Sequence, residues 1–236
     1  MCDHNSPIGS AKEIDRGNWT DLPNVEYEIR LIEDKLSGQN NTILIDDDAT
    51  EPALNSLSKD KITTLHISTH GFYRDNAGLT EAAKNPENVD YNIARRFISA
   101  GISEISGLVL REGNLSWKSR YILEEHDDLL TDNDIELLSF PNLNLTVLSA
   151  CDTGLGEIDS DGVWGLQRAF RITGAKSLIC SLAKVDDYWT AQFMDAFYEQ
   201  AAQGKSIYDS FHIAQRWLRK ELPDNSEIWS SFILIE

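Results

Sequence analysis

Cysteine is scarce in this sequence. The 236 residues include three cysteines, Cys2, Cys151 and Cys180, and no two of them have the C-x-x-C spacing typical of zinc sites. An odd and small number of cysteines also argues against a disulfide framework. We therefore expect no metal site and no disulfides, and a reducing, cytoplasmic location.

Positive charge and long apolar runs are also in short supply. Lys and Arg number 21 against 39 Asp and Glu, which gives a formal net charge of -18. Nonspecific binding to nucleic acid or to an anionic membrane needs a basic surface, so we expect neither partner. The N-terminal 19 residues hold no apolar segment of the kind found in signal peptides, and no run is long enough to cross a bilayer.

The sequence alternates between helical and strand-like patterns. Residues 1–21 are polar and aperiodic, and we expect a flexible lead-in or linker there, followed by a single domain over 22–236. Apolar spacing predicts helices over 24–36, 50–57, 132–140, 161–174, 187–203 and 207–221. Strands are expected over 42–46, 62–69, 106–112, 143–150, 175–183 and 228–236, and a long loop with some helix over 74–100. This order predicts an α/β fold, a three-layer α/β/α sandwich with a mostly parallel sheet.

Two of the predicted strands end in reactive residues. His70 follows the strand at 62–69, and Cys151 follows the strand at 143–150. Ligands of open α/β sheets bind outside the carboxyl ends of the strands. If these two strands are neighbours, a thiolate nucleophile and a proton-carrying imidazole share one crevice. We expect Gly71 to allow a sharp backbone turn, so that its N–H and that of Cys151 hold an oxyanion.

Each candidate also has a simpler interpretation. A cysteine at a strand end is commonly a small buried apolar residue, and a lone histidine is commonly a structural hydrogen-bonding group. His66 lies within its strand, and we expect it to support the site or the core. Cys180 lies in an apolar β-run and is expected in the core.

Two further sequence patterns each have more than one interpretation. The acidic runs 46–48 and 124–128 are expected on solvated loops or faces, with a calcium site as the alternative. The glycine-rich segment 153–162 has neither the G-x-G-x-x-G spacing nor the lysine of a phosphate-binding loop. We expect it to shape a substrate cleft.

The two reactive segments, 64-TLHISTHGFY-73 and 145-LTVLSACDTGLGE-157, occur in an order that resembles a known family. Together with 22–36, 162–187 and 229–236, they resemble the CHAT domain, a caspase-like peptidase domain usually associated with tetratricopeptide repeats. The resemblance extends over roughly 22–236. It implies a caspase-haemoglobinase fold and a cysteine endopeptidase with Cys151 as nucleophile, His70 as catalytic histidine and Gly71 as an oxyanion donor. It also implies a protein substrate, no cofactor, and regulation by a tetratricopeptide-repeat or other protein region.

The sequence departs from the family in one segment. The family commonly carries Trp-Pro before Val-Asp-Asp, whereas this chain has Ala183 and Lys184 there. Acidic residues near the expected cleft are candidates for a pocket that accepts Arg or Lys, although a neutral side chain and ordinary cap, turn or surface roles remain open; they are Asp152, Asp186 and Asp187.

Two other functions compete with the peptidase. One is a caspase-like signalling module with weak or absent catalysis, and the other is a nucleotide-binding α/β domain. The long segments 74–100 and 112–128 are where we expect a partner-operated switch.

Overall fold

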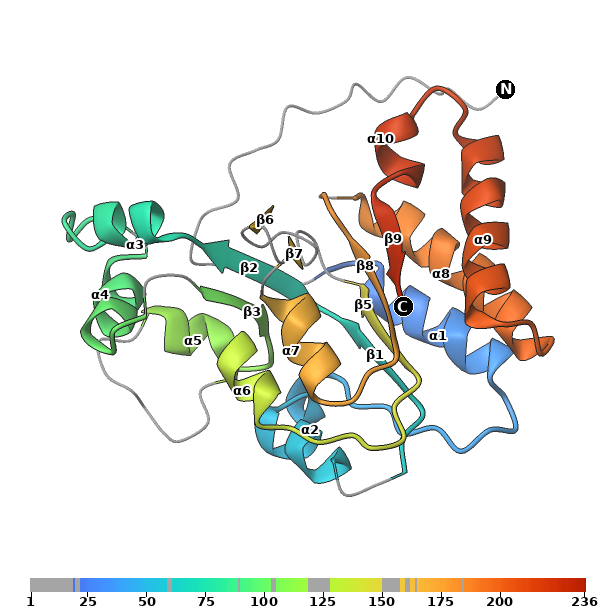
Figure 1. Ribbon diagram of the computed structural model, residues 1–236, viewed down its shortest axis with the longest axis horizontal. Helices are drawn as coiled ribbons and strands as arrows, with labels where there is room; N and C mark the ends of the chain where they lie inside the picture. Colours follow the sequence, from blue (N-terminus) through green and yellow to red (C-terminus); the bar gives the residue numbers. More distant parts are fainter. Residues whose placement is uncertain are drawn as a thin grey trace.

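A computed structural model describes most of the chain. The described residues are 19, 22–58, 61–88, 90–102, 105–118, 128–149, 158–159, 162–163, 165–183 and 185–236. A central sheet lies between two groups of helices, and a second, smaller sheet extends to one side (Figure 1).

Four strands form the main sheet. They are β1 (Thr64–Ser68), β5 (Leu145–Ser149), β8 (Ser177–Ser181) and β9 (Phe232–Ile235), in the order β1-β5-β8-β9. The β1–β5 and β5–β8 pairs are parallel, and β9 runs antiparallel to β8. Every residue of β5 and β8 is buried, as expected for parallel strands covered on both faces. The predicted mostly parallel sheet is confirmed.

Helices cover both faces of the main sheet and complete three layers (Figure 1). One face carries α1 (Val25–Lys35), α8 (Asp187–Ala202) and α9 (Ile207–Glu221); the other carries α2 (Glu51–Leu57), α6 (Asp132–Glu136) and α7 (Leu166–Ile172). Side chains alternate along each strand, so Val147 and Ile179 pack toward α8 while Leu148 and Leu178 pack toward α7. Burial of this apolar surface stabilises the layers by roughly 25 cal/mol per Å².

The second sheet is antiparallel and carries its own core. Its strands are β2 (His70–Arg74), β3 (Ile105–Val109) and β4 (Leu129–Thr131), in that order. The helices beside it are α3 (Asn76–Ala82), α4 (Tyr91–Ser99) and α5 (Gly113–Lys118). Trp117 is fully buried in this core. The ring of Trp19 packs against it at a centroid distance of 4.9 Å and against Phe72 at 6.1 Å.

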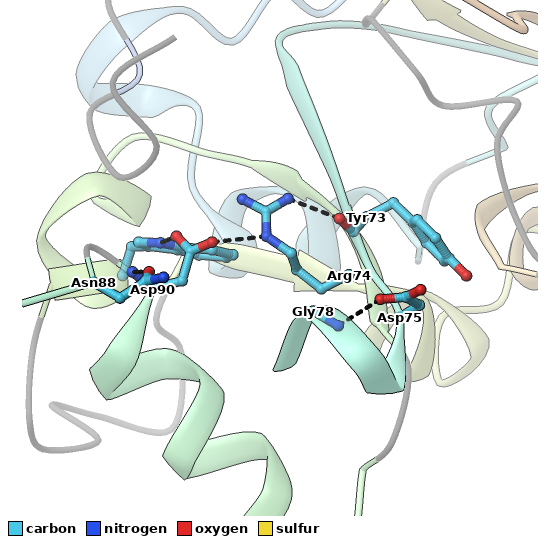
Figure 2. A network of polar contacts seen from close by, with 7 residues as sticks. Tyr73, Arg74, Asp75, Gly78, Asn88 and Asp90 are labelled. Carbon is cyan, nitrogen blue, oxygen red and sulfur yellow. Dashed lines mark hydrogen bonds and ion pairs between the residues drawn. The ribbon is translucent and has the colours of Figure 1, made fainter. Parts of the chain in front are cut away.

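A buried carboxylate fastens the parts of this second unit together. Asp90, at the start of α4, accepts hydrogen bonds from Arg74 Nε at 2.8 Å and Trp117 Nε1 at 3.0 Å. Figure 2 shows Arg74 reaching from β2 toward Asp90, while its Nη1 donates to the carbonyl of Tyr73 at 2.7 Å. One acid thus joins β2, α4 and α5.

Four short elements complete the described chain. They are the 3-10 helix η1 (Asp46–Asp48), the paired strands β6 (Ile158–Asp159) and β7 (Gly162–Val163), and α10 (Ser226–Trp229).

The helix predictions hold where caps and apolar spacing agree. Those over 50–57, 187–203 and 207–221 match α2, α8 and α9 within one residue at each end. Thr50 Oγ1 accepts from the N–H of Ala53 at 3.3 Å at the start of α2, and Ser206 Oγ accepts from the N–H of Asp209 at 3.0 Å at the start of α9. Such caps satisfy N–H groups that have no partner within the helix.

Several local predictions are wrong. Residues 42–46 form no strand, and the apolar side chains of Ile43 and Ile45 are 41% and 45% exposed. The segment 74–100 holds α3 and α4 and is not mainly a loop, because Asp75 caps α3 and a short apolar face on α4 packs inward. The helix predicted over 161–174 begins only at Leu166, after Gly165 at φ 97°. The terminal strand begins at Phe232, after α10.

Candidate functional site

The carboxyl ends of β1 and β5 lie side by side at one edge of the main sheet. The two strands are parallel neighbours, and their last residues, Ser68 and Ser149, are partners in the register. A cavity opens at this edge, lined among others by Thr69, His70 and Asp187. The sheet therefore brings the strands that precede His70 and Cys151 in the sequence to one edge, where α/β proteins bind ligands.

His70 stands where the chain passes from one sheet to the other. It is the first residue of β2, half-buried, and pairs with Val109 of β3. Thr69 Oγ1 donates to the carbonyl of the same Val109 at 2.5 Å, which fastens this crossing point. Gly71 lies inside β2 opposite Leu108, so the sharp turn predicted at Gly71 is wrong. The chain changes sheets at Thr69.

Three of the predicted site residues lie outside the described residues. They are Cys151, Asp152 and Lys184. The described chain on the cysteine side ends at Ser149, which closes β5 and lies two residues before Cys151. The positions of the nucleophile and of the first acidic candidate therefore stay predictions.

Asp186 and Asp187 differ in their surroundings. Asp186 is exposed and is the N-cap of α8, where its Oδ1 accepts from the N–H of Tyr188 at 3.0 Å. Asp187 is half-buried and lines the cavity with Thr190. Of the two, Asp187 has the placement that a pocket acid requires.

A buried polar cluster, which the sequence analysis did not find, lies directly under this edge. Glu28 of α1 is 3% exposed. Its Oε1 accepts from His66 Nε2 at 2.9 Å, and its Oε2 accepts from Ser68 Oγ at 3.1 Å and Ser149 Oγ at 2.9 Å. With Tyr198 of α8, whose hydroxyl lies 3.0 Å from His66 Nδ1, these residues form what we call the Glu28 cluster.

The sequence does carry a signal for this cluster. Glu28 lies three residues after Val25 and four before Ile32, so it interrupts the apolar stripe of α1. An acid on the inward face of an amphipathic helix must find buried donors. His66 is bonded through both ring nitrogens within this cluster, and its role as a supporting or core residue stays a prediction.

Cys180 is a buried thiol, and its burial makes it unreactive. Its side chain is fully buried between the sheet and α7, with Gln167 Nε2 at 3.7 Å from Sγ. Burial raises the pKa of Cys180 to about 12, so the thiolate is absent at neutral pH. The core position predicted for Cys180 is confirmed.

The described ranges hold no group of three His, Cys, Asp or Glu side chains arranged to bind a metal ion. None of their helices combines the length and the apolar character that crossing a bilayer requires.

Comparison with known families identifies the chain. The family model described as the CHAT domain matches residues 3–236, so it also includes most of the segment expected as a lead-in. No curated protein matches the chain.

Proposed function

The chain belongs to the CHAT domain family, and on this premise we propose that it is a cysteine endopeptidase with Cys151 as nucleophile and His70 as its proton carrier. The family is related to caspase-like peptidases. The observation that carries the proposal is the parallel pairing of β1 with β5, since His70 and Cys151 each follow one of these strands by two residues. A small cavity of about 20 Å³ lies beside His70 at this edge.

The proposed reaction uses only groups of this chain and water. The Cys151 thiolate attacks the carbonyl carbon of the scissile bond, and the oxyanion accepts hydrogen bonds from the N–H groups of Gly71 and Cys151. The imidazolium of His70 then protonates the leaving amine as the C–N bond breaks. Water attacks the thioester, His70 takes its proton, and release of the carboxylate restores the thiolate.

The substrate is proposed to be a protein, and the regulator a tetratricopeptide-repeat or other protein region. Both follow from the family resemblance. A cytoplasmic location belongs to the same proposal, because three cysteines without a disulfide framework fit a reducing compartment.

A peptide probe tests the proposal. An electrophilic acyloxymethyl ketone peptide is added to the full chain, and the modified residue is identified by mass spectrometry. We expect labelling at Cys151, lost in Cys151→Ala and reduced at least tenfold in His70→Ala, because the thiol loses its proton acceptor. Cys180→Ala is the matched control, and it should keep labelling near the wild-type rate.

Two outcomes would count against a peptidase. Labelling that survives Cys151→Ala assigns reactivity to another residue. Absence of both labelling and cleavage, even with a regulatory protein partner present, favours the alternative of a catalytically weak or inactive signalling module.

A further inference from the structure

The Glu28 cluster lies at the last residue pair of the β1–β5 ladder. Ser68 and Ser149 are register partners and close their strands. Beyond this pair, the chain after β1 leaves through Thr69 for the second sheet. Within the described residues, the pairing of β1 with β5 ends at Ser68 and Ser149, two residues before His70 and Cys151 in the sequence.

A side-chain bridge continues the connection at this point. The same oxygen, Glu28 Oε2, accepts from both serine hydroxyls, at 3.1 and 2.9 Å. Bonds to a charged acceptor are shorter and stronger than bonds between neutral groups. Glu28 thus holds the ends of β1 and β5 at a fixed separation, because both serine hydroxyls bind the same oxygen, Oε2.

The rest of the cluster holds Glu28 itself in place. The pKa of Tyr198 is raised because its hydroxyl is buried and because Glu28 is negative, so the phenol keeps its proton. With Tyr198 as donor, His66 Nδ1 is the acceptor and His66 Nε2 carries the hydrogen that is donated to Glu28 Oε1. The hydrogen bonds therefore run in one direction, from Tyr198 of α8 to His66 of β1 and on to Glu28 of α1.

The cluster has apolar side chains on one side and the cavity on the other, since Glu28, Ser68 and Ser149 also line the cavity beside His70. Its neighbours on this face are side chains such as Val147 and Phe197, which are fully buried. Within the described residues, the basic side chain that contacts Glu28 is His66, which is neutral in this arrangement of donors. Removing a carboxylate from water without a Lys or Arg partner costs free energy, and an apolar side chain would join α1 to the sheet without this cost. Stability alone is therefore a weak reason for Glu28.

We propose that Glu28 is a positioning residue, which sets the distance between the His70 and Cys151 segments through Ser68 and Ser149. This inference rests on the proposed cysteine peptidase function. It assigns no contact with substrate to Glu28, which acts through the strand ends.

The pH dependence of Cys151 alkylation tests the inference. A thiol paired with a histidine ionises below the usual value near 8.5, and separating the pair returns it toward that value. Alkylation by iodoacetamide is followed at Cys151 by mass spectrometry in the full chain. The described titratable groups at this edge lie on four elements; they are Glu28 (α1), His66 (β1), His70 (β2), and Asp187 and Tyr198 (α8).

The key variants are Glu28→Gln and Ser149→Ala. We expect Glu28→Gln to raise the alkylation midpoint by about one pH unit, which slows the reaction about tenfold below both midpoints. Ser149→Ala removes one of the three bonds and should give a smaller upward shift. It also keeps the test decisive if Glu28→Gln does not fold.

Lys35→Gln is the matched control on the same helix. Lys35 joins α1 to α8 through Asp195 at 3.4 Å and Glu199 at 2.8 Å, and it is not part of the Glu28 cluster. Loosening α1 in this way should leave the midpoint of Cys151 unchanged, even if the melting temperature falls.

The outcomes separate the two proposals. A wild-type midpoint near 8.5 would overturn the dyad and with it this inference. A low wild-type midpoint that stays low in Glu28→Gln and Ser149→Ala would leave the peptidase proposal standing and refute the positioning role. Equal shifts in Lys35→Gln and Glu28→Gln would show that α1 acts as a whole and would also refute it.

Discussion

Asp186 and Asp187 are adjacent in the sequence and have different surroundings. Asp186 caps α8 from an exposed position, while Asp187 is half-buried at the cavity. Residue type alone made them equal candidates for a substrate pocket. The direction in which each side chain leaves the start of a helix separates them, and that direction depends on where the helix begins.

This difference predicts that substitutions of Asp187 and of Asp186 have different effects on KM. Asp187→Asn should raise KM for substrates with Lys or Arg at P1 by about tenfold to a hundredfold, the loss expected for a bond to a charged group. Asp186→Asn removes the same charge but keeps a good N-cap, so KM should stay within about twofold. The measurement is steady-state cleavage of a peptide series that varies only at P1. Cleavage confined to neutral P1 residues would dismiss an acidic pocket.

At the scale of elements, the second sheet and its helices form a unit with its own core and its own buried acid. Asp90 links β2 to α4 and α5 through Arg74 and Trp117 (Figure 2). His70 is the first residue of this unit, so its stability bears on the site.

Asp90→Ala should therefore be strongly destabilising. It leaves the indole N–H of Trp117 without its acceptor and Arg74 without its carboxylate, and we expect a loss of about 2–4 kcal/mol in the free energy of unfolding. Urea denaturation followed by tryptophan fluorescence measures it. The control is Lys84→Ala, which removes an exposed pair with Glu81 at 3.1 Å and should cost less than about 0.5 kcal/mol. Similar losses in both variants would contradict a structural role for Asp90.

Comparison of elements also shows what the sequence could predict. The main strands and the long helices were found because their apolar spacing matches one buried face, as in α9 with Phe211, Ala214 and Leu218. The second sheet was missed as a unit because only Thr69 separates β2 from β1, and because β4 has only three residues. That β1 and β5 are neighbours was a condition of the predicted site, and the structure meets it. The Glu28 bridge could not be predicted in the same way, because it depends on side chains from three separate elements.

At the scale of the whole molecule, the formal net charge of -18 dominates the long-range electrostatic interactions. Like charges on a compact chain repel one another and destabilise the folded state. The exposed ion pairs, such as Arg111 with Asp47 at 2.7 Å, each contribute little.

Added salt should therefore stabilise this protein. Raising NaCl from about 0.01 to about 1 M shortens the screening length from about 30 to about 3 Å, and we expect the melting temperature to rise by a few degrees. Differential scanning calorimetry at constant pH checks this. A melting temperature that falls with NaCl would mean that attractive pairs outweigh the net repulsion.

The passage through Thr69 has a consequence for how such a protein diversifies. His70 opens the second sheet, while the cysteine segment follows a strand of the main sheet. Insertions and exchanges in α3, α4 and α5 can therefore accumulate on one side of this boundary without disturbing the packing of β5. A lineage can remodel these helices beside the strand that carries His70, while Leu108 and Leu130 of the second sheet keep their place in the core with Leu148 of β5.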